Sequence, residues 1–581
     1  MSHILSKERI ESDYASTTEP PSEARIEPPP LQLTDQTNLL PFRKIVPCFF
    51  GLALCIVVST LDSVVVATSL PTISVAFNAG SFVSWVPSAY LLTSTSFQPL
   101  YGRFSDIFGR KVAISIAMCF FMLGNLLAGF SKTIIQLIVF RGIAGVGGGG
   151  IVSMAQIVIS DIVSLRERYS RRDRGKYQGI VGGVIALGYA IGPVIGGALS
   201  QKASWRWSFW ISVPTSLSAL LVVIFLLPLK PVSGDMISKL LAIDYVGMVL
   251  TLLGCILVIL PIIWGGVTFP WSSPIVLGTL FSGVVIVIAF CLWEWKKARL
   301  PIVPMYIFKH STVTGVYITM FVNGFVYFST SYYLPQFFQA VLSATPIGAG
   351  VFLIPVLVSQ MIVSWISGMI VSKTGKYRYI IHSGFTLWSV ACGLISTINP
   401  DSHKSVIAVY MILAGCGAGQ TLQTTTVAAQ ASVSRKDMSV VTAFRNFVRL
   451  LGGTLALAVG GTVVNNFLRN SMAALALDPA AITKIVNDPS LLSSPSTYTE
   501  LGLTEALVQT IRREGYTKGF RAVFIMNAVL TAIATIASIT LIKHKELTRG
   551  DEDMLKQKAK EEAGMTVATG PALSAGSNTN A

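Results

Sequence analysis

Two charged residues lie inside long apolar segments of this sequence. Asp62 is part of LDSVVVATSLP (61–71) and Arg141 begins RGIAGVGGGG (141–150). A buried carboxylate is unstable as an ion in lipid, so it can take up and release a proton at different stages of a cycle. Arginine keeps its proton and can stabilise a nearby carboxylate or anchor an anion. We therefore expect Asp62 and Arg141 to take part in proton coupling, against the alternatives of a fixed helix–helix hydrogen bond and of packing on backbone carbonyls.

A short turn carries the second candidate site. The sequence GRFSDIFGRK (102–111) contains Gly102, Asp106, Gly109, Arg110 and Lys111. The glycines allow a tight turn, and Asp106 can sit against a helix N-terminus, where the helix dipole favours an anion. Arg110 and Lys111 can pair with it or with acids on a neighbouring helix. We expect a charge cluster that forms in one conformation and breaks in another; the alternative is simple anchoring by positive charge.

Small residues form a third pattern, in the segment 177–200. Gly188, Gly192, Gly196 and Gly197 make a face that lets helices approach closely, and Pro193 can kink the helix. We expect this segment to be tightly packed and bendable. Ordinary close packing explains the same pattern.

Aromatic and amide side chains within the apolar segments are candidates for a substrate cavity. Such a mixture suits bulky, amphipathic, weakly charged organic molecules. Few acids accompany these residues, which favours neutral or anionic compounds over strongly cationic ones. The candidates are Trp85, Tyr90, Gln98, Phe325, Tyr332, Tyr333, Gln339, Gln360, Gln420 and Gln423.

Arg445 and Arg449 raise the same question as Arg141 in a later segment. Their spacing of four places them on one face of a helix. For this pair we favour a role in packing.

Other kinds of site are not expected. Gly145, Gly147 and Gly150 fit a dinucleotide-binding spacing, but they lie in an apolar helical segment without the strand that such a site needs. The sequence contains no ATP-binding P-loop, its five histidines lack metal-ligand spacing, and all seven cysteines fall in apolar segments. We expect no cofactor, no metal site and no enzymatic activity.

Composition identifies the surroundings of these residues. Of 581 residues, 52% are apolar and only 12% are charged, about half the charge of a soluble protein. The apolar residues form runs of about 20, each long enough to cross a bilayer. The net charge of +16 would suggest nucleic acid in a soluble protein, but here the basic residues cluster in alternate loops, which is a topology signal.

The runs predict an all-α membrane protein with fourteen transmembrane helices, because only helices or closed barrels satisfy their backbone in lipid and barrel strands are shorter. The expected spans are 45–67, 82–101, 112–130, 134–158, 177–200, 207–228, 243–265, 274–294, 312–340, 346–370, 379–398, 405–429, 439–465 and 519–542. Lys and Arg gather in the even-numbered loops, which places these loops and both termini in the cytoplasm.

The sequence GMIVSKTGKYR (368–378) repeats the glycine and basic spacing of 102–111, after the second span of a later group of six. This repeat predicts two related six-helix bundles, in residues 45–230 and 301–545, with an inserted helix pair in 231–300. Residues 1–44 and 546–581 are expected to be disordered cytoplasmic tails. The long loop 466–518 is expected on the other side of the membrane, with short amphipathic helices.

These motifs together resemble the major facilitator superfamily, specifically the fourteen-span drug:proton antiporters in their fungal form. The turn 102–111, Arg141 with its glycines, the pattern from Gly179 to Gly197 and LDSVVVATSLP resemble the signatures of this branch, in the right order and on the right spans. WRWSFWISVP (205–214) and YYLPQFFQAV (332–341) also look like fungal members. The resemblance covers roughly residues 45–545, although the second turn lacks the acid of the first.

The resemblance implies proton-coupled export of hydrophobic small molecules, such as drugs, toxins or secondary metabolites, by alternating access. The expected partners are such a substrate, protons and the bilayer, with no nucleic acid, and the protein is expected to be a monomer in the cell membrane. Two alternatives stay open. The same fold could transport siderophores or basic amino acids, including across a vacuolar membrane, or it could serve as a transport-inactive sensor that tolerates Asp62→Asn.

Overall fold

The structure is a computed structural model that describes residues 42–77, 83, 85–163, 174–227, 232, 235–265, 269–342, 344, 346–487, 503–545 and 547. Most of the two expected tails, residues 1–41 and 548–581, lies outside the described residues. The same holds for 488–502 within the expected loop 466–518.

Helices make up the described chain, which confirms the predicted all-α fold class. The only β feature in the described ranges is an isolated bridge between Gly265 and Phe269. The first half contains α1 (Phe42–Phe77), α2 (Trp85–Phe108), α3 (Arg110–Gly129), α4 (Ile134–Ile162), α5 (Arg174–Lys202), α6 (Trp207–Trp210), α7 (Ser212–Leu226), α8 (Met236–Leu241), α9 (Tyr245–Trp264) and α10 (Pro274–Lys296). The second half contains α11 (Ser311–Ala340), α12 (Pro346–Thr374), α13 (Arg378–Ile395), α14 (Lys404–Leu422), α15 (Thr424–Ser432), α16 (Met438–Ala474), α17 (Pro479–Asn487), α19 (Glu505–Thr510) and α20 (Thr517–Leu541).

Every one of the fourteen expected spans coincides with helix. Within the described residues, eleven helical segments are long and apolar enough to cross a bilayer. The expected spans 82–101, 177–200 and 379–398 correspond to α2, α5 and α13, which fall outside that set. The helix α2 is rich in Ser and Thr, α5 is rich in Gly, and α13 is short. The count of fourteen therefore stays a prediction.

The expected loop 466–518 is more helical than the sequence suggests. The helix α16 continues to Ala474, and α19 joins α20 through a π-helical turn, Ile511–Tyr516. Between them lies the short helix α17, in the sequence PAAITKIVN. At this end of the molecule the long helices extend well beyond the length that a bilayer requires.

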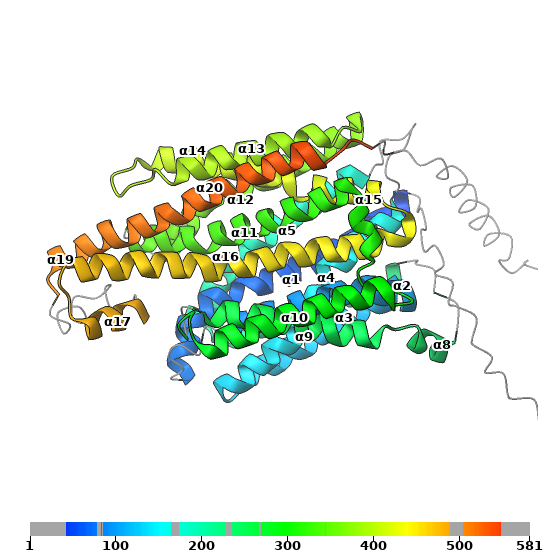
Figure 1. The fold of residues 1–581 in the computed structure, drawn as a ribbon, viewed down its shortest axis with the longest axis horizontal. Coiled ribbons are helices and arrows are strands. Elements are labelled where there is room, and N and C mark those ends of the chain that lie inside the picture. The colour runs from blue at the N-terminus through cyan, green and yellow to red at the C-terminus, as the bar shows by residue number, and fades with distance from the viewer. Residues whose placement is uncertain are drawn as a thin grey trace, which may run out of the picture.

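The two halves of the chain repeat one pattern of helix packing. In the first half, α1 packs on α5 and α7, α2 and α3 pack on α4, and α3 packs on α7. In the second half, α11 packs on α16 and α20, α12 and α13 pack on α14, and α13 packs on α20. The two sets of pairs are the same when the six long helices of each half are matched in chain order, which are α1, α2, α3, α4, α5 and α7 in the first half and α11, α12, α13, α14, α16 and α20 in the second. The two halves therefore form related bundles (Figure 1).

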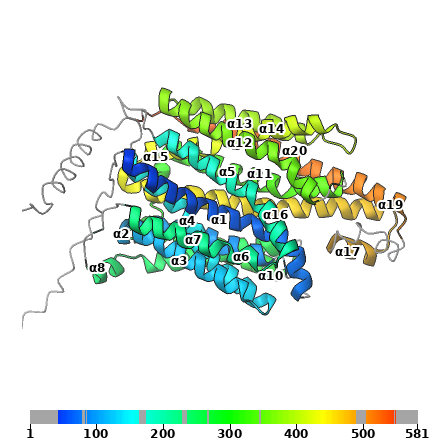
Figure 2. The ribbon, with the colours of Figure 1, turned by 180° about the vertical axis from the view of Figure 1, so that it is seen from behind.

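The bundles meet along two helix pairs, α2 with α16 and α5 with α12. Each pair joins the second long helix of one bundle to the fifth of the other. The helices α9 and α10 pack on each other, and α9 also contacts α2 and α16. The helices α8 and α15 lie at one end of the molecule and α17 and α19 at the other (Figures 1 and 2). We call these the α15 end and the α17 end.

The repeated turns share a backbone feature. Gly109, between α2 and α3, has φ of 96°, and Gly375, between α12 and α13, has φ of 73°. Side chains rarely adopt this left-handed conformation, so glycine is favoured at the same point of both turns. The sequence repeat thus corresponds to a conformational repeat.

The outer surface is apolar. Large exposed side chains cover the inserted pair, for example Ile275 (49%), Phe281 (66%) and Val285 (64%) on α10. An apolar surface of this extent requires lipid around it. The chain is therefore a multi-pass membrane protein.

Candidate functional site

Asp62 and Arg141 form a buried ion pair inside the first bundle. Arg141 Nη1 lies 2.9 Å from Asp62 Oδ2 and 3.0 Å from Asn125 Oδ1. Ser212 Oγ donates to Asp62 Oδ1 at 3.3 Å. Both charged side chains are almost fully buried, at 0% and 1% exposure. Four helices, α1, α3, α4 and α7, thus converge on one pair of opposite charges.

Tyr90 joins this ion pair to the space between the bundles. The guanidinium carbon of Arg141 lies 4.4 Å from the centre of the Tyr90 ring and 5.5 Å from that of Phe209. A cation is attracted to the face of an aromatic ring. Tyr90 also lines the central cavity described below. A displacement of Arg141 is therefore felt by a side chain of the cavity wall.

The glycines after Arg141 position α4 against α2. A Cβ at Gly145 would collide with the Tyr90 carbonyl oxygen, and a Cβ at Gly148 would collide with the Tyr90 hydroxyl. The helices approach closely because these positions lack side chains. The glycine spacing that fits a dinucleotide motif therefore serves helix packing.

A small cavity lies between the bundles, about 70 Å³ in volume. This is room for about two water molecules, whereas drug-sized ligands need about 300 Å³ or more. The site is therefore closed in this conformation. Its lining residues are Ser59, Thr60, Ser63, Tyr90, Leu91, Ser94, Gln98, Gly148, Val152, Gln156, Ile185, Tyr189, Phe328, Leu422, Arg445, Asn446, Arg449 and Leu450.

Of the ten residues predicted for the cavity, only Tyr90 and Gln98 are among its described lining. Gln423 is adjacent to it, since its Oε1 accepts from Gln156 Nε2 at 3.4 Å. Gln420 instead accepts from Ser383 on α13 at 2.6 Å, and Gln360 lines a separate pocket of about 30 Å³.

The aromatic candidates face elsewhere in this conformation. The Trp85 ring packs 5.7 Å from Trp264 of α9, and Tyr333 Oη donates to the Leu457 carbonyl at 2.5 Å within the second bundle. Phe325 is buried where α11 packs on α16. Tyr332 and Gln339 are exposed on α11. These residues lie outside the lining in this conformation, because one residue along a helix turns the side chain by about 100°, which residue type does not determine.

Arg445 and Arg449 line the cavity, although the sequence favours packing for them. Arg445 Nη1 donates to Asn446 Oδ1 at 2.7 Å, and its Nη2 donates to Thr425 Oγ1 at 2.9 Å and to the Leu422 carbonyl. Arg449 Nε donates to Asn323 Oδ1 at 3.0 Å. Arg445 and Arg449 therefore bond to neighbouring helices and also line the cavity.

The cavity floor toward the α15 end is a layer of amides that joins the bundles. Asn446 Nδ2 of α16 donates to Gln156 Oε1 of α4 at 2.8 Å and lies 3.1 Å from Ser153 Oγ. Gln98 Nε2 donates to the same Ser153 oxygen at 2.9 Å. The sequence prediction did not include Gln156, Ser153 and Asn446. The signal available for Gln156 is an amide inside the apolar stretch IVSMAQIVIS.

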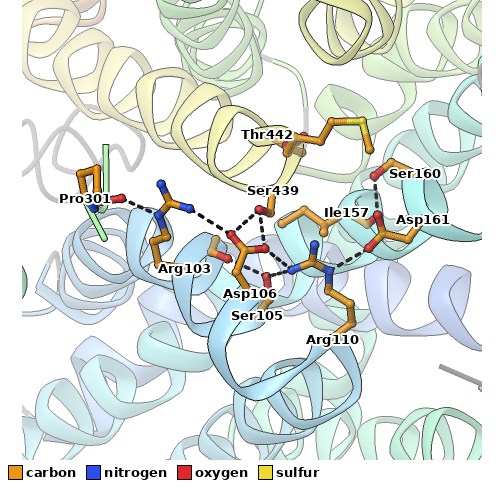
Figure 3. A network of polar contacts seen from close by, with 12 residues as sticks. Arg103, Ser105, Asp106, Arg110, Ile157, Ser160, Asp161, Pro301, Ser439 and Thr442 are labelled. Atoms are coloured by element: carbon orange, nitrogen blue, oxygen red, sulfur yellow. Dashed lines mark hydrogen bonds and ion pairs between the residues drawn. The ribbon is translucent and has the colours of Figure 1, made fainter. Parts of the chain in front are cut away.

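A charge cluster closes the bundles at the α15 end (Figure 3). Arg110 Nη1 lies 2.5 Å from Asp106 Oδ1, and its Nε lies 2.7 Å from Asp161 Oδ2 of α4. Arg103 Nη1 lies 3.5 Å from Asp106 Oδ2, and its Nε donates to the Pro301 carbonyl at 2.5 Å. These charged side chains are no more than 7% exposed.

The cluster reaches across to the second bundle. Ser439 Oγ lies 2.7 Å from both carboxylate oxygens of Asp106. Ser439 is the second residue of α16, so Asp106 lies at a helix N-terminus, where the dipole favours its charge. Gly102 allows the close approach, since a Cβ there would lie 3.2 Å from the Val440 Cα and 3.3 Å from the Ser439 carbonyl oxygen.

Lys111 lies apart from this cluster, so the pairing expected for it with Asp106 is not formed in this conformation. It is half-buried on the outer face of α3, in a surface groove with Val112, Ser115 and Ile116. A helix turns by about 100° per residue, so neighbouring basic residues at its start point in different directions.

The glycines of α5 pack against α1 and α12. A Cβ at Gly188 would collide with Thr60 Oγ1, and one at Gly192 would lie 3.1 Å from Val64 Cβ. Gly196 is buried. Pro193 and Gly197 lie within α5, but their surroundings are outside the described part of the structure.

Comparison with known proteins places these features in a family. The model of the Major Facilitator Superfamily matches residues 52–242 and 243–457. "Efflux pump dotC" of Dothistroma septosporum is 35% identical over 445 residues, which are 76% of this chain and 75% of the relative. "Citrate exporter 1" of Yarrowia lipolytica is 32% identical over 537 residues, covering 92% of this chain and 78% of the relative.

Solved structures agree at the level of the fold. The proton:xylose symporter XylE superimposes with a TM-score of 0.55 at 12% identity, covering 89% of this chain and 99% of that one. The repeated bundles, the matched residues and the relatives lead to one conclusion. This chain belongs to the major facilitator superfamily, with fungal efflux pumps among its relatives.

Proposed function

We propose that this protein is a proton-coupled antiporter that exports hydrophobic or amphipathic small organic molecules by alternating access. The proposal rests above all on the buried pair of Asp62 and Arg141 and on its contact with the cavity through Tyr90. Proton uptake by Asp62 would remove the charge that Arg141 faces. An arginine left without its carboxylate in a buried site is strongly destabilised, so the surrounding helices would have to rearrange.

The gate residues support alternating access. The cavity is sealed toward the α15 end by the amide layer and by the cluster around Asp106, both of which join the two bundles. Opening this end breaks the Ser439–Asp106 bonds between the bundles, whereas the bonds from Arg110 to Asp106 and Asp161 stay within the first bundle. One bundle would thus rock against the other, while the ion pairs of Arg110 within the first bundle stay intact.

The relatives support export. They include efflux pumps and a citrate exporter, all from fungi. We infer that the α15 end faces the cytoplasm, that both termini lie there, and that the protein acts as a monomer in the cell membrane. Strongly cationic substrates such as basic amino acids are disfavoured, because two arginines line the cavity.

The test compares cells that express the wild type with cells that express Asp62→Asn. A panel of toxic aromatic compounds identifies a substrate by its reduced accumulation in cells with the wild type. An uncoupler should then restore accumulation to the level of cells without the protein. Asp62→Asn should abolish proton-driven export while the protein still reaches the membrane, because asparagine cannot exchange a proton.

Asp401→Asn is the matched control, since Asp401 is 80% exposed and pairs with the exposed Arg513. It should export like the wild type. Export that continues unchanged with uncoupler, or in Asp62→Asn, would rule out proton coupling through Asp62. A protein without export whose cellular effect survives Asp62→Asn would instead be the transport-inactive sensor.

A further inference from the structure

We propose that Arg445 and Arg449 bind the acidic group of the substrate, so that the cavity selects organic anions with an apolar or aromatic body. This inference rests on the proposed transport function of the same cavity and specifies the substrate class.

Arg449 has a donor that the surrounding protein does not use. Its side chain is nine-tenths buried and lines the cavity, yet its Nη2 has no hydrogen-bond partner among the described residues. Its Nε is held by Asn323, and its side chain also bonds to the Tyr189 side chain. Its guanidinium carbon lies 5.0 Å from the centre of the Tyr327 ring and 5.6 Å from that of Phe328. Buried polar groups are nearly always paired, so a free donor at a cavity points to a ligand.

Arg445 is held rigidly beside it. It is fully buried, and its two terminal nitrogens donate to Leu422, Thr425 and Asn446, while its Nε has no partner in the described structure. These bonds fix the guanidinium in place before a ligand arrives. A preorganised charge loses little entropy on binding.

The charge balance at the cavity is the main argument. Arg141 faces Asp62, and Arg110 faces Asp106 and Asp161. By contrast, neither Arg445 nor Arg449 forms an ion pair with any described residue. Two like charges one helical turn apart, buried without a counterion, are stabilised by an anion, and guanidinium groups match carboxylates and sulfonates in shape.

The rest of the cavity fits the body of such an anion. Tyr90, Tyr189 and Phe328 supply aromatic walls, and Ile185 and Leu450 supply apolar ones. The amide layer of Gln98, Gln156 and Asn446 forms the floor of the same cavity and can bind neutral polar groups. A flat ring with an acidic group satisfies both parts of this lining.

A purely structural role is the rival explanation. The bonds of Arg445 to Leu422 and Thr425 tie α16 to α14 and α15, which accounts for Arg445 without a ligand. It does not account for the free Nη2 of Arg449. The experiment therefore centres on Arg449.

The test measures binding to the purified full-length protein in detergent, by the rise in its thermal unfolding midpoint. Three probes share the naphthalene ring: 1-naphthoate is negative, 1-naphthamide is neutral and 1-naphthylmethylammonium is positive. A ligand that binds only the folded protein stabilises it. We expect 1-naphthoate to raise the midpoint clearly more than the other two.

Arg449→Gln should lower the affinity for 1-naphthoate at least tenfold, and Arg449→Lys should restore part of it because the charge returns. Arg513→Gln is the matched control, an exposed arginine paired with Asp401, and should bind like the wild type. Size-exclusion chromatography verifies that each variant is folded.

Equal stabilisation by the three probes, unchanged binding of 1-naphthoate to Arg449→Gln, or no stabilisation by 1-naphthoate would each overturn the proposal. Because binding is measured without a proton gradient, anion selectivity can fail while proton coupling stands, and the reverse.

Discussion

Arg110 holds two carboxylates from two helices, Asp106 and Asp161, and Asp106 in turn accepts from Ser439 of the other bundle. Asp106 therefore makes a bond within its own bundle, to Arg110, that persists when the bundles rock. Its bonds to Ser439 of the other bundle must break. A hydrogen bond to a charged group contributes about 1.5–3 kcal/mol, so this one residue can set the balance between closed and open forms of the α15 end. A neutral amide in its place keeps the shape but weakens the closure.

Asp106→Asn should therefore raise the open population at the α15 end by roughly tenfold to a hundredfold. The measurement is the rate at which a maleimide, added from that side, labels Val152→Cys at the cavity wall in a protein otherwise free of cysteine. Lys111→Gln is the control, because Lys111 lies apart from the cluster. Equal labelling rates in Asp106→Asn and the control would show that Asp106 does not hold the gate closed.

At the scale of one residue, the sequence indicated which side chains are charged and buried, but not all of their contacts. Asp62 and Arg141 stand out because a charge in an apolar segment requires a partner. The lack of an acidic partner for Arg445 and Arg449 among the described residues could not be predicted, because a counterion can come from any helix that packs nearby. Their roles, like those of the other site residues, stay predictions.

Among the elements, α5 shows how glycine residues, which have no side chain, position a helix. Gly188 lets α5 lie on α1, and Gly179 lets the same helix approach α12 of the other bundle. One helix thus packs within its own bundle along one stretch and across the bundle interface along another. Small residues are the means by which helices pack closely in lipid.

Gly188→Ala should lower the thermal unfolding midpoint of the purified protein, because the added Cβ collides with Thr60 Oγ1. Overpacking of this kind costs about 1–3 kcal/mol. Thr60→Ala in the same chain should restore part of the loss. Gly350→Ala, where a Cβ meets nothing within 4 Å, is the control and should not lower the midpoint, since alanine favours a helix more than glycine does. A similar midpoint in Gly188→Ala and the control would contradict the close packing described.

Helix positions were easier to predict than helix rotations. The apolar runs predicted where the helices lie along the chain, since a backbone that crosses lipid must be helical over about 20 residues. They did not show which side chains face the cavity, because polar residues in these helices also face neighbouring helices, and the pattern does not separate the two. Tyr90 and Gln98 lie on the inner face of α2, whereas Gln420 faces α13.

For the whole molecule, the repeat of helix pairings means that the two contact lines between the bundles, α2 with α16 and α5 with α12, are equivalent. The α15 end is closed along both contact lines, at Asp106 with Ser439 and at Gly179 with Ser364, whose Oγ donates to the Gly179 carbonyl at 3.2 Å. The turn repeat at Gly109 and Gly375 made this symmetry predictable from the sequence. The closed state was not predictable, because both states use the same residues.

A disulfide across the second contact line should lock the α15 end. Gly179 and Gly368 face each other across this line, since a Cβ at Gly179 would lie 3.1 Å from the Gly368 Cα. The same Cβ would lie 2.8 Å from the Ser364 carbonyl oxygen, so the two helices must shift slightly apart before the bridge in Gly179→Cys/Gly368→Cys closes. Oxidation should abolish export of the substrate found in the cell assay, and a reductant should restore it. The two single variants are the controls. Full export by the oxidised double variant would show that these helices need not separate.

Arg445 and Arg449, which have no acidic partner in the described part of the chain, have a consequence for the energy source. Moving a monovalent anion out while one proton comes in transfers two elementary charges across the membrane in each cycle. At 100 mV, negative inside, this supplies about 4.6 kcal/mol. A pump with such a site would keep exporting when the pH is equal on both sides, driven by voltage alone, and would stall at equal pH once potassium also depolarises the membrane.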